Sequence, residues 1–104
     1  MRRDAQARHH LERAYAHLDA GEPEDALREC DRAIAMAPAW AEAHNLRGVV
    51  LDEIGRLEQA IAAYAEAVRL DAGFEDAAEN LAEARKEMCG PGPTWMRSLA
   101  FGAS

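Results

Sequence analysis

The fold of this protein is decided by the stretch HLERAYAHLDAGEPEDALRECDRAIAM, residues 10–36, which returns 34 positions later as HNLRGVVLDEIGRLEQAIAAYAEAVRL, residues 44–70. Residue identity or class is kept at matching positions, as in the pairs His10 and His44, Arg13 and Arg47, Gly21 and Gly55, Ala26 and Ala60, Leu27 and Ile61, and Trp40 and Phe74. Each copy contains two stretches with apolar residues three or four positions apart, separated by a turn at the glycine. A repeat of this length predicts stacked pairs of antiparallel helices.

Turn residues mark where these helices are expected to begin and end. Asp4 is the predicted N-cap of the first helix, and Pro23 falls in the first turn of the second, where its missing N–H costs nothing. Pro38 ends the second helix, because proline disfavours helical geometry in the residue before it. Gly55 and Gly73 are the predicted ends of the third and fourth helices.

Small residues recur where paired helices should come closest. A bulky side chain at such a position would push the two backbones apart, so alanine or glycine is required there. The predicted close contacts are at Ala14, Ala26, Ala33, Gly48, Ala60 and Ala67.

The repeated positions resemble those of the tetratricopeptide repeat family, whose pattern is W-x2-L-G-x2-Y, then A-x3-F, then P. At these positions the first copy has His10, Arg13, Ala14 and His17, then Ala26 and Cys30, then Pro38, and the second has His44, Arg47, Gly48 and Leu51, then Ala60 and Tyr64, then Ala72. A third copy begins at Glu75 and stops at Met88, and it resembles the capping helix of that family.

The resemblance implies an all-α fold, a short right-handed superhelix of antiparallel helix pairs with two hairpins and a C-terminal capping helix. It divides the chain into a repeat domain at residues 1–88 and a Gly/Pro turn with an apolar tail at residues 89–104. Within the repeat domain, the repeats are expected at residues 7–40 and 41–74, and the capping helix at residues 75–88.

Composition restricts the classes of function. The chain of 104 residues suffices for one small domain, and its 19 acidic against 12 basic residues give a formal net charge of −7. Such a surface repels a phosphate backbone, so nucleic acid is not an expected partner. Charged residues interrupt every apolar run before it reaches the roughly 18 residues of a membrane span, and no secretory signal is visible after Arg2 and Arg3. We therefore expect a soluble, cytoplasmic protein with no membrane partner.

The inner, concave face of the superhelix is the expected peptide-binding groove, because one stripe of the first helix in each pair remains free there. The expected groove residues are Arg8, Leu11, Tyr15, Leu18, Glu42, Asn45, Val49, Asp52 and Glu79. Leu11, Tyr15 and Leu18 form a continuous apolar strip, which either contacts a bound peptide or packs on neighbouring helices. Asn45 is either a hydrogen-bonding group for a peptide backbone, as such asparagines are in family grooves, or a solvated helix residue.

The resemblance also bears on the kind of partner. The family's best-known binding mode holds the C-terminal carboxylate of chaperone tails through lysines and asparagines on the inner face. The present groove offers Leu11, Tyr15, Val49 and Glu79 and no facing pair of lysines, so such a clamp is not expected. An acidic, partly apolar groove favours a basic or amphipathic protein or peptide. The expected function is that of a scaffold, a protein–protein interaction adaptor.

The C-terminal tail is unusually apolar. Residues 89–93, CGPGP, cannot continue a helix, and Thr94 then begins a segment with the anchor residues Trp95, Met96, Leu99 and Phe101. Three alternatives remain: the tail folds back on the capping helix or into the groove, docks on a second copy as a homodimer, or is a linear motif for another protein. Docking on a second copy or on a larger complex would make the chain a self-associating assembly element, which is the alternative to an adaptor.

The sequence contains no recognisable catalytic motif. No two histidines stand four residues apart on one helix, and no phosphate-binding loop or nucleophile elbow occurs, so we expect no metal, no cofactor, no catalytic residue and no enzymatic activity. Cys30 is placed like a buried small apolar residue, which favours a reduced thiol over a disulfide with Cys89. The carboxylates stand three or four residues from arginines, as on a solvated helix surface.

Overall fold

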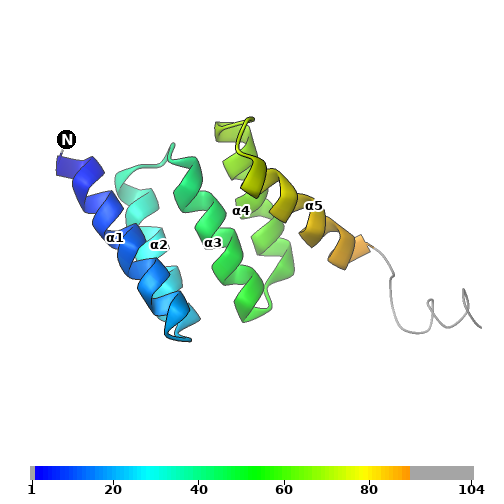
Figure 1. Cartoon of the computed structure of the whole chain (residues 1–104), viewed down its shortest axis with the longest axis horizontal. Helices are drawn as coiled ribbons and strands as arrows, with labels where there is room; N and C mark the ends of the chain where they lie inside the picture. The colour runs from blue at the N-terminus through cyan, green and yellow to red at the C-terminus, as the bar shows by residue number, and fades with distance from the viewer. Residues whose placement is uncertain (1, 90–104) are drawn as a thin grey trace, which may run out of the picture.

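The structure, a computed structural model, describes residues 2–89 of the chain. This part contains five α-helices and no strand: α1 (Arg2–Asp19), α2 (Pro23–Met36), α3 (Ala41–Ile54), α4 (Leu57–Leu70) and α5 (Glu75–Cys89). Each helix contacts the next along the chain, and α3 also contacts α1 and α5. Figure 1 shows α1, α3 and α5 in one layer and α2 and α4 in the layer behind it. The predicted all-α arrangement of antiparallel helix pairs is confirmed.

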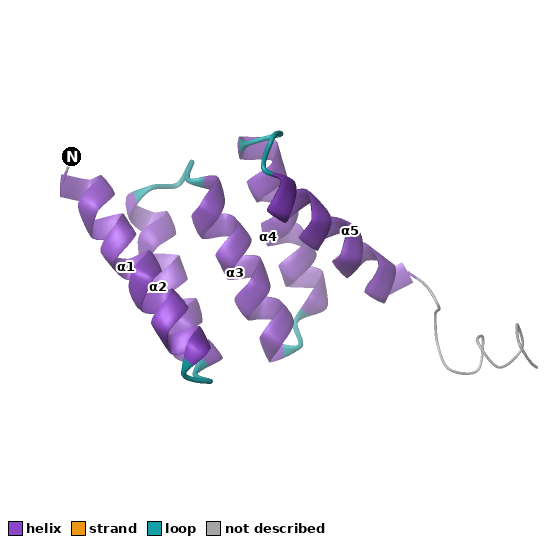
Figure 2. Ribbon diagram, viewed as in Figure 1, coloured by secondary structure: helices purple, strands orange, loops and turns teal. Residues whose placement is uncertain are grey.

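Short loops join the helices (Figure 2), and most of their turn residues act as predicted. Pro23 is the first residue of α2, and α2 ends one residue before Ala37, the neighbour of Pro38. Gly55 caps α3 with a left-handed φ of 94°, a conformation in which glycine is strongly favoured.

Two predicted helix boundaries are wrong. Helix α1 begins at Arg2, so Asp4 lies in its first turn instead of capping it, and its carboxylate still complements the positive end of the helix dipole. Helix α4 ends at Leu70 and its C-cap is Asp71, before Gly73 is reached. The Asp71 carboxylate accepts a hydrogen bond of 3.1 Å from the Gly73 N–H, a side-chain turn that the glycine rule does not anticipate.

The core confirms the predicted close helix contacts. Ala14, Ala26, Ala33, Ala60 and Ala67 are all 0% exposed. Gly48 is buried as well, and a Cβ atom added to it would lie 2.5 Å from Cε1 of Tyr64. The buried residues form two clusters, one centred on the first hairpin and reaching α3, and one on the second hairpin and α5.

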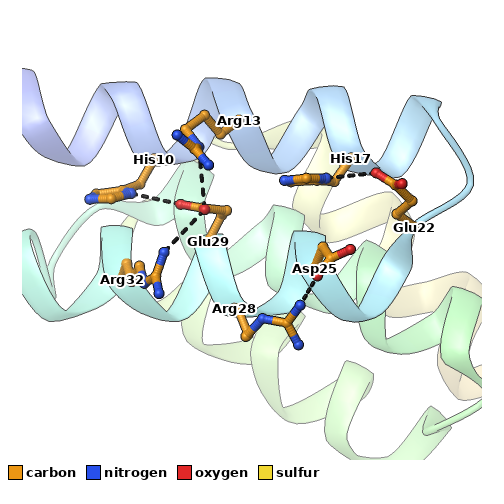
Figure 3. Close-up of polar contacts among 8 residues, drawn as sticks. All are labelled: His10, Arg13, His17, Glu22, Asp25, Arg28, Glu29 and Arg32. Carbon is orange, nitrogen blue, oxygen red and sulfur yellow. Dashed lines mark hydrogen bonds and ion pairs between the residues drawn. The ribbon is translucent and has the colours of Figure 1, made fainter.

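A buried carboxylate joins the two helices of the first hairpin (Figure 3). Glu29 is 4% exposed and lies 2.7 Å from His10 Nδ1, 3.2 Å from Arg32 Nη1 and 3.3 Å from Arg13 Nε. Burial raises the pKa of Glu29, but the hydrogen bond to His10 and the two guanidinium charges outweigh it and hold that pKa below its ordinary value. The expectation that the carboxylates lie on solvated faces is therefore wrong for Glu29.

None of the helices within residues 2–89 combines the length and the apolar character needed to cross a membrane.

Candidate protein-binding face

Two hydrogen bonds link the helices of the front layer. The Tyr15 hydroxyl of α1 donates to Oε2 of Glu42 in α3 at 3.1 Å, and Nδ2 of Asn80 in α5 donates to Oδ1 of Asn45 in α3 at 3.0 Å. Three predicted groove residues, Tyr15, Glu42 and Asn45, are thus brought onto one surface that runs across α1, α3 and α5. We call this surface the front face.

Tyr15 is the main exposed aromatic group of this surface. Its side chain is 42% exposed, although its hydroxyl is held by Glu42. Burial of the hydroxyl end raises the pKa of Tyr15 to about 12, and the charges of Glu42 and Asp76 act in the same direction. The hydroxyl therefore stays protonated near neutral pH and remains a hydrogen-bond donor.

A second group of carboxylates influences the pKa of Tyr64. Burial raises the pKa of Tyr64 to about 12, and the next causes are the charges of Asp52, Glu87 and Glu53. These three acids come from the last turns of α3 and α5, whereas Glu42 and Asp76 come from the first turns. The first turns of the two helices therefore carry negative charge, and in their last turns the three acids outnumber Lys86 of α5.

The predicted apolar strip is divided by the packing of α1. Leu11 is 3% exposed and belongs to the core of the first hairpin, and Leu18 is half-buried against the same core. Ala7, Leu11, Ala14 and Leu18 fall three or four residues apart and form the buried stripe, while Tyr15 lies roughly 70° round the helix from the centre of that stripe. Leu11 therefore packs in the core and is not available to a ligand.

The other predicted groove residues differ in exposure. Val49 is half-buried and packs against both core clusters. Asp52 and Glu79 are exposed. Arg8 is also exposed, and its guanidinium carbon lies 5.4 Å from the ring centroid of Trp40, a cation–π geometry.

Arg8 and Trp40 line a cleft that the sequence analysis missed. The cleft has a volume of about 470 Å³ and lies between α1 and the α2–α3 loop, lined by Asp4, Ala7, Arg8, Ala37, Pro38, Ala39 and Trp40. A second cleft of about 480 Å³ lies one repeat further along, lined by residues 39–42, Leu70, Asp71 and Phe74. The signal in the sequence for these clefts was an aromatic residue that recurs at the repeat spacing, as Trp40 and Phe74.

A histidine and two carboxylates meet at the turn between α1 and α2 (Figure 3). One ligand atom from each of His17, Glu22 and Asp25 lies within 4.8 Å of the others. His17 Nδ1 and Glu22 Oε1 are 2.8 Å apart, and Asp25 pairs with Arg28. Protein contacts alone account for this grouping, which spacing within one helix could not reveal because a turn separates His17 from the acids.

Two further expectations concern the cysteines and the tail. Cys30 is a free, buried thiol, and burial raises its pKa to about 12, so it is neutral near neutral pH. The tail anchor residues Trp95, Met96, Leu99 and Phe101 lie outside the described residues.

Stacked antiparallel helix pairs with one shared face across their first helices define an α-helical repeat protein. The chain belongs to the tetratricopeptide repeat family: the family model with that description matches residues 11–73. A comparison with curated protein sequences gives no match.

Solved structures agree with this assignment. The chain is similar to MamA, with 26% identity and a TM-score of 0.77 over 80% of this chain and 48% of MamA, so it spans about half the length of that protein. It is equally similar to the second TPR of Spaghetti (RPAP3) bound to the HSP90 peptide SRMEEVD, with 25% identity and a TM-score of 0.77 over 80% of this chain and 77% of that one. The first TPR of Spaghetti, at 21% identity and a TM-score of 0.74, supports the fold alone.

Proposed function

We propose that this protein is a protein-interaction adaptor, not an enzyme, and that it binds an extended protein or peptide segment along the front face. The observation that carries the proposal is the pair of cross-helix hydrogen bonds, Tyr15 to Glu42 and Asn80 to Asn45, which order polar groups of three helices on one surface. A solved relative of the same fold is bound to a peptide, which supports this class of function.

The Asn45 and Asn80 pair is suited to a peptide backbone. Asn80 donates through Nδ2 to Oδ1 of Asn45, so Nδ2 of Asn45 and Oδ1 of Asn80 have no hydrogen-bond partner among residues 2–89. One is a donor and the other an acceptor, which matches the N–H and C=O of a peptide unit. Both side chains are partly exposed, so a ligand can reach them.

Charge favours a basic ligand. Glu42 accepts a hydrogen bond from Tyr15. Besides burial, the charges of Glu42 and Asp76 raise the pKa of Tyr15, and those of Asp52, Glu87 and Glu53 raise the pKa of Tyr64. The peptide bound by the Spaghetti domain, SRMEEVD, has three acidic side chains, and carboxylates at both ends of the front face would repel such a sequence. Because Lys86 is the chain's one lysine, a clamp of two lysines cannot form here. We therefore expect a segment that combines Lys or Arg with an apolar side chain.

The groups near this face are suited to binding and not to chemistry. The tyrosine hydroxyls stay protonated near neutral pH, because the pKa values of Tyr15 and Tyr64 are raised to about 12. The thiol of Cys30 is buried in the first hairpin, where a substrate cannot reach it. Among the side chains of residues 4–88, these groups offer no activated nucleophile that would support an enzymatic function.

Fluorescence anisotropy with two labelled probes tests the proposal. The first probe is a peptide of alternating Arg and Leu, and the second replaces every Arg by Glu. Both have about twelve residues, on the order of the length that an extended peptide needs to cross three helices. The basic probe should bind more tightly, and its affinity should fall as salt is raised. Asn45→Ala should weaken binding of the basic probe about tenfold, because a backbone hydrogen bond to a partly buried group is lost.

A matched control is Gln59→Ala, which removes an exposed amide from α4 in the other layer and should leave binding unchanged. Equal affinity for the two probes would refute the predicted charge preference. Equal losses in Asn45→Ala and Gln59→Ala, at unchanged helix content, would refute the assignment of the binding site to the front face.

A further inference from the structure

Helix α5 has one open side. Within residues 2–89 it contacts only α4 and α3, towards which it buries Ala77, Leu81 and Ala84. Next to this buried stripe, on the side away from Asn80, Ala78 and Ala82 are exposed. At the C-terminal end of the helix, Met88 is 41% exposed. Met88 lies in line with the buried stripe and lines a cleft with residues 55–59, so we call only Ala78 and Ala82 the open side of α5.

In the two complete hairpins, the positions that correspond to Ala82 are covered. Ala82 stands 34 residues after Gly48, which in turn stands 34 residues after Ala14. Ala14 is 0% exposed, and Gly48 is buried against the ring of Tyr64, which belongs to the second helix of its own hairpin. Helix α5 thus has the small residue that a hairpin partner requires, while no described residue covers it.

The sequence that follows α5 keeps part of the register of a second hairpin helix, although Phe101 falls at the position of the buried Ala33 and Ala67. Pro91 stands two repeat lengths after Pro23, which is the first residue of α2. Residues 91–104 fall at the positions that the 14-residue helices α2 and α4 occupy in their repeats. Trp95 falls at the position of Leu27 and Ile61, both of which are half-buried against a core cluster.

We infer that residues 94–101 pack in cis on the open side of α5. The segment is apolar, with Trp95, Met96, Leu99 and Phe101 and the single charge of Arg97, and each aromatic side chain brings roughly 150 to 250 Å² of surface that water would otherwise contact. Only residues 90–93 separate it from α5, a span of at most about 15 Å, so the segment can reach the open side of α5. The high effective concentration of a segment tethered this closely favours the contact within one chain over a contact with a second copy.

Two substitutions in the full chain test this contact. Ala82→Arg places a long charged side chain on the open side, and Trp95→Ser/Phe101→Ser removes the two anchors from the tail. With the native tail, Ala82→Arg should lower the melting temperature by about 5 °C or more. With the altered tail, the same substitution should leave the melting temperature unchanged, because the contact is already lost. The control is Ala35→Arg at an exposed position of α2, which should have no effect with either tail.

Hydrogen exchange supplies a second measurement on the same proteins. Backbone amides of residues 94–101 should exchange about tenfold or more slowly than in an unfolded chain, and Ala82→Arg should abolish this protection. Exchange at the unfolded-chain rate in the native protein would overturn the inference. An equal loss of melting temperature from Ala82→Arg with both tails would also overturn it. A molecular mass that rises with protein concentration, and no longer does so with the altered tail, would show that the tail docks on a second copy and would overturn it too.

Discussion

Replacing Gly48 by alanine is expected to destabilise the second hairpin, although alanine is the better helix former. A Cβ atom on Gly48 would lie 2.5 Å from Cε1 and 2.6 Å from Cδ1 of Tyr64, whose side chain is 2% exposed and has no solvent-filled space to move into. Helix propensity favours alanine by about 1 kcal/mol, whereas overpacking costs about 1 to 3 kcal/mol. Because the contact is so short, the upper part of that range applies, and we expect a net loss of about 1 to 2 kcal/mol.

The first hairpin provides the control for this prediction. One repeat earlier, Ala14 takes the place of Gly48 and Cys30 takes the place of Tyr64, and both are 0% exposed. Each hairpin therefore matches a small residue with a side chain of complementary size. Tyr64→Cys alone leaves a void that costs about 3 kcal/mol or more. The double variant Gly48→Ala/Tyr64→Cys copies the first hairpin and should be about 1 to 2 kcal/mol more stable than the sum of the single effects predicts.

Urea unfolding followed by the helical circular dichroism signal measures all four proteins. An unchanged slope with a shifted midpoint reports a change in stability alone. If Gly48→Ala is as stable as the native protein or more stable, helix propensity outweighs the contact and the reasoning is refuted. Strictly additive single effects would show that residues 48 and 64 do not contact each other as described.

Three further perturbations test other parts of the structure. Ala60→Leu should overpack the same hairpin and lower the free energy of unfolding by about 1 to 3 kcal/mol, and an unchanged urea midpoint would count against this helix pairing. Glu29→Ala should cost about 1 to 3 kcal/mol at neutral pH. The pKa of Glu29 in the folded protein is below its ordinary value, so its contribution to the free energy of unfolding is complete above the ordinary pKa and is lost as pH falls through the folded pKa. The stability of Glu29→Ala should therefore fall less steeply towards acid pH than that of the native protein. Parallel curves of stability against pH would contradict this. In a Cys89→Ser background, Cys30 should react with a thiol reagent only when the protein unfolds, because the thiol is buried and burial raises its pKa to about 12. Rapid labelling of the folded protein would show instead that Cys30 is accessible.

Predictions from the sequence succeeded where one helix or one repeat supplies the information. The recurrence of Gly21 at Gly55 and the place of Pro23 fix the turns, because glycine and proline act on the backbone at their own positions. They left two alternatives open for Leu11, because apolar spacing identifies a stripe but not which of two neighbouring stripes is buried, and the structure shows that Leu11 packs on neighbouring helices. The pairing of α1 with α2 buried the stripe of Leu11 and left Tyr15 exposed.

The part of the front face that depends on contacts between helices could not be read in advance. Asn45 and Asn80 are 35 residues apart, and their hydrogen bond exists only because α5 packs beside α3. The cleft between Arg8 and Trp40 likewise requires the α2–α3 loop to pass close to α1. No local pattern specifies such a distance, because it depends on how far one helix is rotated against the next.

The sequence by itself determined that this protein is a helical repeat, since the 34-residue period places turns and small residues at fixed intervals and each acts through local backbone geometry or close helix contact. Only the tertiary structure decided which side chains remain for a partner. Leu11 is buried in the core, whereas Tyr15 hydrogen-bonds to Glu42 and Asn80 to Asn45 on the surface. The carboxylate of Glu29 is buried next to His10 and two arginines. The reason is physical: periodicity sets the contacts within a helix, whereas packing between helices sets the exposure and the electrostatic surroundings of each side chain.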